Sequence, residues 1–181
     1  MTETEEQIDY KEIEMENFED LNKLHDGKLV QGIYEYGFEN PSQIQRKTLP
    51  AILDGKDLIA QASSGSGKTG AFSIGVLGNV DPKSECLQGV IMANTHELAT
   101  QIYHVIKDLG ENMNVKIGLC IGRSKQDTDD HKNDEITSSI NDAAQKHILV
   151  CTPGKMLSFL NDKRPKSSSL KNNFFKESKN F

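Results

Sequence analysis

Apolar positions recur along the chain with two spacings, one helical and one extended. Between residues 26 and 36 they follow the period of a helix, and Gly37 suits the left-handed stop of that helix. A second helix is predicted to begin at Pro41, with Asn40 as its cap. The first third of the chain is therefore expected to contain at least two helices.

Short uninterrupted apolar runs predict buried strands, and they occur at residues 58–60, 87–93, 115–121 and 148–150. Helical patterns separate these runs, one ending near Asn79 and another covering residues 97–109. Such alternation indicates a mostly parallel sheet with helices on both faces, so the expected fold class is α/β. A length of 181 residues has room for one such domain.

Three polar segments lack any periodic pattern. Residues 1–17 are expected to form a disordered acidic leader and residues 124–146 a solvated insertion. Residues 161–181 are expected to be a basic polar tail, for which an extension that touches RNA is the alternative. The folded domain is therefore predicted over residues 18–160.

Composition narrows the classes of function. The net charge is −6, but nine acids and one lysine fall within residues 1–20, so that segment carries −8 and the rest carries +2. A nucleic-acid partner therefore stays possible. No apolar run approaches the roughly 18 residues of a membrane span, and the N-terminus shows no targeting pattern, so we expect a cytoplasmic or nuclear address and no membrane partner. Three widely spaced cysteines predict reduced structural thiols.

The strongest chemical motif is the run Ala62-Ser63-Ser64-Gly65-Ser66-Gly67-Lys68-Thr69, placed between a predicted strand and a predicted helix. Small residues let backbone amides surround a phosphate, and the helix N-terminus and Lys68 add positive charge. The hydroxyl of Thr69 is a candidate ligand for Mg²⁺. This setting predicts a P-loop that binds a nucleotide with Mg²⁺, and a flexible Gly/Ser linker is the alternative.

Upstream of this loop, the run Gly37-Phe38-Glu39-Asn40-Pro41-Ser42-Gln43-Ile44-Gln45 resembles the Q motif of DEAD-box RNA helicases, and residues 69–74 are similar to the initiation factor 4A branch. The resemblance implies a RecA-like domain that binds ATP. It also implies that Gln45 reads the adenine edge, whose paired donor and acceptor a carboxamide can match. Phe18 is expected to stack on the base. The alternative for Gln45 is an ordinary position on a helix surface.

Later motifs resemble the RNA-binding motifs of the same family. The run Ala93-Asn94-Thr95-His96-Glu97-Leu98-Ala99 is similar to PTRELA, Ile121-Gly122-Arg123 to the glycine pair, and Thr152-Pro153-Gly154-Lys155 to TPGR. Asn94 and Glu97 are also predicted to cap the following helix. The resemblance implies that single-stranded RNA contacts Thr95, His96, Glu97, Gly122, Arg123, Thr152, Gly154 and Lys155. Turn and cap chemistry is the alternative for each motif alone.

Hydrolysis in this family also uses an Asp-Glu-Ala-Asp box and a second lobe, and the chain contains neither. We therefore expect a monomeric ATP-binding lobe of an RNA helicase that does not turn over alone, with Lys68 and Thr69 as its catalytic residues. Translation initiation or other ribonucleoprotein factors are expected partners. The alternatives are a non-catalytic ATP- and RNA-binding or decoy module, and an unrelated P-loop kinase or NTPase, which the Q motif disfavours.

Overall fold

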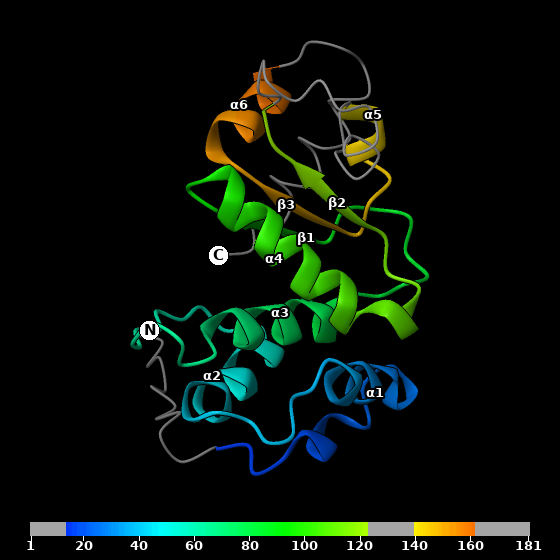
Figure 1. The fold of residues 1–181 in the computed structure, drawn as a ribbon. Helices are drawn as coiled ribbons and strands as arrows, with labels where there is room; N and C mark the ends of the chain where they lie inside the picture. The colour runs from blue at the N-terminus through cyan, green and yellow to red at the C-terminus, as the bar shows by residue number, and fades with distance from the viewer. Residues whose placement is uncertain (1–13, 123–139, 162–181) are drawn as a thin grey trace, which may run out of the picture. The chain divides into compact units, whose positions relative to one another are not determined.

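The computed structural model describes residues 14–122 and 140–161, which belong to two compact units (Figure 1). The first unit is Met1–Asn79 and the second is Val80–Phe181. None of the helices in the described ranges is both long enough and apolar enough to span a membrane.

The described part of the first unit is built from helices. Two short 3-10 helices come first and three α-helices follow: η2 (Phe18–Leu21), η3 (His25–Gly27), α1 (Lys28–Glu35), α2 (Gln43–Leu53) and α3 (Lys68–Asn79). Helix α1 buries its apolar face against η2, η3 and α3, whereas α2 packs along α3. The helices predicted around residues 26–36 and up to Asn79 are confirmed, and Gly37 has the predicted left-handed conformation, with φ +97°.

Glycines allow α2 and α3 to approach closely. A Cβ atom added to Gly75 would lie 2.5 Å from Ile52 Cγ2, and one added to Gly78 would lie 2.4 Å from Leu53 Cδ2. Both distances are shorter than a van der Waals contact, so a larger residue would displace the side chains of α2. This packing fixes α3, which begins inside the phosphate motif, against α2, which carries Gln45.

Two sequence predictions for this unit are wrong. Helix α2 begins at Gln43 with Ser42 as its cap, and not at Pro41 with Asn40, because the Gln45 side chain returns to accept a hydrogen bond from the Ser42 amide at 2.8 Å. Residues 58–60 form no strand, and Leu58 and Ile59 are exposed. A short apolar run forms a strand only when a neighbouring strand pairs with it, and the described part of this unit contains no strand.

The second unit contains a three-stranded parallel sheet. Its strands are β1 (Gly89–Met92), β2 (Ile117–Cys120) and β3 (Ile148–Cys151), in the order β1-β3-β2. All three predicted strands of this region are therefore confirmed, with β1 and β2 shorter than their apolar runs and β3 one residue longer. Strand β3 lies between the other two and is buried at all four positions, which matches its continuous apolar sequence.

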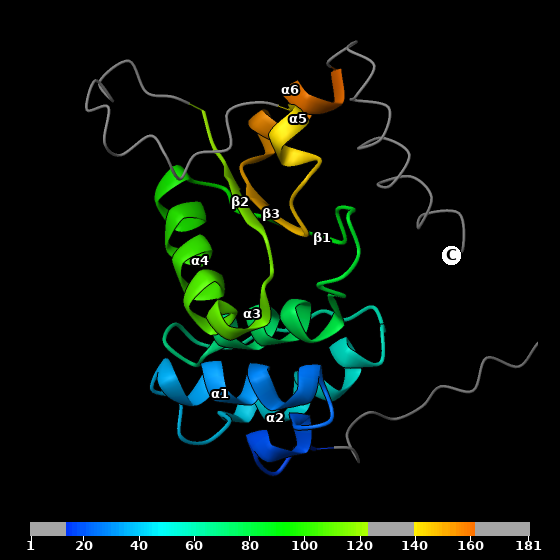
Figure 2. The same cartoon turned by 90° about the vertical axis from the view of Figure 1, so that its right-hand side faces the viewer.

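Helices cover both faces of this sheet, as Figure 2 shows. On one face, α4 (His96–Leu109) packs against β2 and β3. On the other, α5 (Ile140–Ala143) and α6 (Pro153–Asn161) contribute Ala143, Met156 and Phe159 to an apolar cluster with Leu149 and Cys151. The predicted α/β fold with a parallel sheet is therefore confirmed. Helix α5 falls within the segment predicted to be a solvated insertion, and the rest of that segment up to residue 139 lies outside the described residues.

Candidate nucleotide and RNA sites

The phosphate motif forms the loop that leads into α3. Gly65 and Gly67 have φ angles of +76° and +94°, a left-handed conformation that favours glycine. Helix α3 begins directly afterwards, at Lys68. Because the first amides of a helix lack internal partners and its N-terminus carries partial positive charge, this end of α3 is suited to an anion. Ser66 Oγ is buried near this end without a hydrogen-bond partner, so it could donate to one.

Lys68 is folded back onto its own loop in this structure. Its Nζ atom donates to the carbonyl oxygen of Ala62 at 2.7 Å and to that of Ser63. Thr69 is half-buried in the first turn of α3. A phosphate group would offer Lys68 charged oxygen acceptors in place of two neutral carbonyls, and charge-assisted hydrogen bonds are about twice as strong as neutral ones.

Gln45 is a buried residue, and not the surface position considered as its alternative. It is 2% exposed, and its carboxamide bridges two parts of the predicted site. Oε1 accepts from the Ser42 amide at 2.8 Å, and Nε2 donates to the Gly67 carbonyl at 3.2 Å. The structure therefore brings the Q-motif run and the phosphate loop together through this one side chain.

The aromatic residues around the Q motif lie differently from the prediction. Phe18 is completely buried, with its ring stacked on Phe38 at 6.5 Å and edge-on to Tyr34, so it offers no surface to a base. Phe38 is only half-buried and lies beside α3, because a Cβ atom added to Gly70 would come within 3.0 Å of its ring. Phe38 stands inside the Q-motif run, but the resemblance implied an aromatic residue farther upstream, so the sequence did not predict a role for Phe38.

In the second unit, two of the predicted RNA-contacting loops meet. The His96 ring lies beside Gly122, since a Cβ atom added there would lie 3.5 Å from His96 Cε1. Thr95 caps α4 by accepting a hydrogen bond from the Leu98 amide at 3.1 Å. Asn94 is therefore not the cap, and the predicted pairing of Asn94 with Glu97 is wrong because the helix begins one residue later than that pairing requires.

The third predicted RNA-contacting loop, which follows β3, is partly buried. Thr152 is 8% exposed, and its amide donates to the Cys120 carbonyl at 3.2 Å, which ties the loop after β3 to the end of β2. Gly154 is exposed, whereas the Lys155 ammonium lies 4.8 Å from the centre of the Phe159 ring. His96 and Glu97 are exposed at the start of α4. Arg123 lies outside the described residues.

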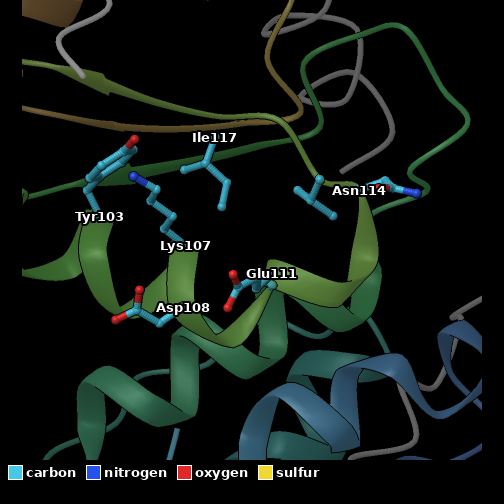
Figure 3. Close-up of a pocket in the computed structure, with 8 residues that line it drawn as sticks. Tyr103, Lys107, Asp108, Glu111, Asn114 and Ile117 are labelled. Carbon is cyan, nitrogen blue, oxygen red and sulfur yellow. The ribbon is translucent and has the colours of Figure 1, made fainter. Parts of the chain in front are cut away.

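A cavity of about 310 Å³ in the second unit lies away from these loops (Figure 3). Its walls come from the end of α4, the 3-10 helix η4 (Glu111–Met113) and the start of β2, and include Tyr103, Lys107 and Ile117. The loops with His96, Gly122 and Thr152 follow the carboxyl ends of the parallel strands, whereas this cavity adjoins the opposite end of β2. It is therefore not part of the predicted RNA surface.

Comparison with known proteins gives one consistent family. The DEAD/DEAH box helicase family matches residues 42–175. ATP-dependent RNA helicase FAL1 of Meyerozyma guilliermondii is 42% identical over 143 residues, which are 79% of this chain and 33% of that protein. ATP-dependent RNA helicase eIF4A of Kluyveromyces lactis is 41% identical over 155 residues, 86% of this chain and 36% of that protein. The chain thus spans about a third of the length of these relatives.

Solved structures agree with the sequence relatives. A DEAD box protein from the hyperthermophile Methanococcus jannaschii matches with a TM-score of 0.68 and 33% identity, over 82% of this chain and 38% of that chain. Dbp5 of S. cerevisiae bound to RNA and ADP BeF3 matches with a TM-score of 0.65 and 30% identity, over 81% and 34% of the two chains. With its phosphate loop, its Q-motif glutamine and its parallel sheet, the chain belongs to the DEAD/DEAH box helicase family.

Proposed function

We propose that this chain is the ATP-binding lobe of an ATP-dependent RNA helicase and binds ATP, Mg²⁺ and the backbone of single-stranded RNA. The observation that carries the proposal is the direct hydrogen bond from Gln45 Nε2 to the Gly67 carbonyl, which joins the glutamine of the Q-motif run to a glycine-rich loop at a helix N-terminus. Dbp5, a structural relative, has been solved with RNA and ADP BeF3, which supports the same pair of ligands here.

The residues around the loop fit a nucleotide with Mg²⁺. Gly65 and Gly67 give the loop two left-handed turns, and the buried Ser66 hydroxyl can donate to a phosphate group. Lys68 would exchange its two carbonyl contacts for phosphate oxygens, and Thr69 would supply a hydroxyl to Mg²⁺. The metal ion would neutralise phosphate charge when bound.

For the base, we propose Phe38 in place of Phe18 as the stacking ring. Phe38 is partly exposed and lies against the first turns of α3, close to the amide of Gln45, whereas Phe18 is enclosed in the core. Gln45 would turn its carboxamide from Gly67 toward the adenine edge, or share it between the two. An amide that both donates and accepts matches the N6 and N7 atoms of adenine.

RNA would bind in the second unit, at the ends of its parallel strands. Thr95 and Glu97 at the start of α4, the His96 and Gly122 pair, and the loop with Gly154 and Lys155 are the proposed contacts. The N-terminus of α4 favours a phosphate group, and the Lys155 ammonium adds positive charge. His96 lacks the planar, permanently charged fork with which arginine holds a phosphate group.

The phosphate assignment is tested by replacing Lys68. We expect Lys68→Ala to weaken ATP binding by about tenfold or more, since a hydrogen bond to a charged group contributes about 1.5–3 kcal/mol. Lys56→Ala is the matched control, because Lys56 is an exposed lysine whose Nζ atom lies 3.7 Å from Asp54 Oδ2, away from the phosphate motif in the sequence. Isothermal titration of the folded chains with ATP and Mg²⁺ measures both. Equal ATP affinity in the Lys68 and Lys56 variants would refute the proposal.

A further inference from the structure

Two of the three cysteines lie directly opposite each other on neighbouring strands. In the parallel register of β2 and β3, Cys120 is the partner of Cys151. The Thr152 amide donates to the Cys120 carbonyl at 3.2 Å, so the strands are still paired at this end. Neighbouring strands lie about 4.8 Å apart, which falls within the Cα separation of about 4.4–6.8 Å found in disulfides.

Both thiols also project to the same face of the sheet. Cys120 is fully buried and Cys151 is 1% exposed, and they belong to one apolar cluster with Leu149, Met156 and Phe159. Side chains at opposed positions of adjacent strands leave the sheet in the same direction. The fold therefore holds two sulfur atoms side by side beneath α6.

We infer that Cys120 and Cys151 are a dithiol modification site, which a small disulfide oxidant converts into a reversible cross-strand disulfide. This inference concerns the folded second unit and is independent of the proposed ATP and RNA sites. The bond would lie at the base of two loops, because Cys120 precedes the loop of Gly122 and Cys151 immediately precedes Thr152.

The chemistry balances with an oxidant such as oxidised glutathione. One cysteine loses its proton and attacks the oxidant's disulfide, giving a mixed disulfide and one molecule of reduced glutathione. The second cysteine then loses its proton and attacks the protein sulfur of that mixed disulfide, which releases a second molecule of reduced glutathione. Two protein thiols are oxidised by two electrons in total, and one oxidant disulfide is reduced to two thiols.

The surroundings make this exchange slow. Burial raises the pKa of Cys151 to about 11, so almost none of it is thiolate at neutral pH, and the oxidant enters only when the cover over the strands opens.

The test compares the folded chain with the unfolded chain at equilibrium, which removes the effect of slow entry. The full 181-residue chain carries Cys86→Ser, which leaves only the two thiols in question. It is held in mixtures of reduced and oxidised glutathione, starting from either form, with and without guanidinium chloride. Acid quenching, alkylation in denaturant and intact-mass measurement then count free thiols, mixed disulfides and the internal disulfide.

We expect the internal disulfide to be favoured about tenfold or more in the folded chain over the unfolded chain, because the fold has already closed the loop between the cysteines. The oxidised chain then unfolds at a higher denaturant concentration than the reduced chain. The variants Cys120→Ala and Cys151→Ala, each with Cys86→Ser, must lack both effects. A disulfide that is less favoured in the folded than in the unfolded chain, or folded chains that carry only mixed disulfides, would overturn the inference.

Discussion

At the scale of single residues, Gln45 connects the helix α2 to the phosphate loop. Its carboxamide is buried, accepts from Ser42 and donates to Gly67, so both of its functional atoms have partners without any nucleotide. A buried polar group that loses its partner costs about 1–3 kcal/mol. Any base that displaces the Gly67 contact must therefore offer an acceptor to Nε2, as N7 of adenine and of guanine does, but only adenine also offers an N6 donor to Oε1.

This arrangement predicts base discrimination. We expect the chain to bind ATP more tightly than GTP, and Gln45→Ala to remove most of that preference. Gln43→Ala is the matched control, because Gln43 is an exposed glutamine in the same helix. Competition of the two nucleotides against a fluorescent ATP analogue measures the preference. If the unmodified chain binds both nucleotides equally, Gln45 serves the fold and not the base.

The buried thiol of Cys151 leads us to predict that the free energy of unfolding depends on pH in the alkaline range. Its folded-state pKa is raised from 9.0 to about 11 by burial, so the folded chain holds this proton more tightly than the unfolded chain does. The stability that this proton gives the folded chain is complete below about pH 9 and is lost as the pH rises toward about 11. Urea unfolding midpoints of the reduced chain should fall over this range.

The Cys151→Ala variant isolates that contribution from other groups. Tyr34 acts in the same direction, because its hydrogen bond to Glu19 raises the pKa of its hydroxyl. The urea unfolding midpoints of the unmodified chain and of the variant are therefore measured at each pH, and the difference between the two midpoints is compared across the range. A constant difference from about pH 8 to pH 11 would contradict the role of Cys151.

At the scale of elements, the start of α4 joins stability to the proposed RNA surface. Thr95 Oγ1 accepts from the Leu98 amide and so satisfies one of the free amides of the first turn. The same turn presents His96 and Glu97 to solvent. Residues proposed to contact RNA are thus held in position by a cap that the sequence alone placed one residue too early, at Asn94.

The cap predicts different effects on the free energy of unfolding when either of two neighbouring residues is replaced. Thr95→Ala should lower the free energy of unfolding by about 1 kcal/mol, the usual cost of losing such a cap. Asn94→Ala should change it little, because Asn94 is exposed and does not cap the helix. Chemical denaturation followed by circular dichroism compares the two. A larger loss for Asn94→Ala than for Thr95→Ala would return the cap to Asn94.

At the scale of the whole molecule, the chain has the binding groups of a helicase lobe in its sequence but no Asp-Glu-Ala-Asp box. It spans about a third of the length of its helicase relatives. Phosphoryl transfer depends on carboxylates that hold Mg²⁺ and water, and on an arginine finger that contributes about 10³ to 10⁵ in rate. Binding without turnover is the consequence we propose for the 181-residue chain.

We expect purified chain to release no phosphate from ATP above background, with or without single-stranded RNA. A phosphate-release assay measures this, and Lys68→Ala serves as the control for contaminating ATPases. RNA-stimulated turnover that disappears in the Lys68 variant would show that another carboxylate acts in hydrolysis. Glu85 and Glu97 would then be the first residues to replace, together with Asp127.

Local chemistry determined much of this protein. The P-loop sequence, the Q motif and the period of the helices are patterns of adjacent residues, so the sequence predicted α1, α3, α4 and the three strands of the sheet. Gly37 adopts the predicted left-handed φ because that preference belongs to glycine itself. The same local patterns singled out Gln45 and the phosphate loop, which the hydrogen bond from Gln45 to Gly67 joins.

Tertiary structure decided the rest, because burial and pairing depend on residues distant in the chain. Residues 58–60 are apolar enough for a strand, but no strand in the described part of their unit pairs with them. The sequence suggested that Phe18 could stack on a base, but in the folded unit its ring is buried against Phe38. Cys120 and Cys151 seemed unrelated at a separation of 31 positions, and only the register of β2 and β3 sets their thiols side by side.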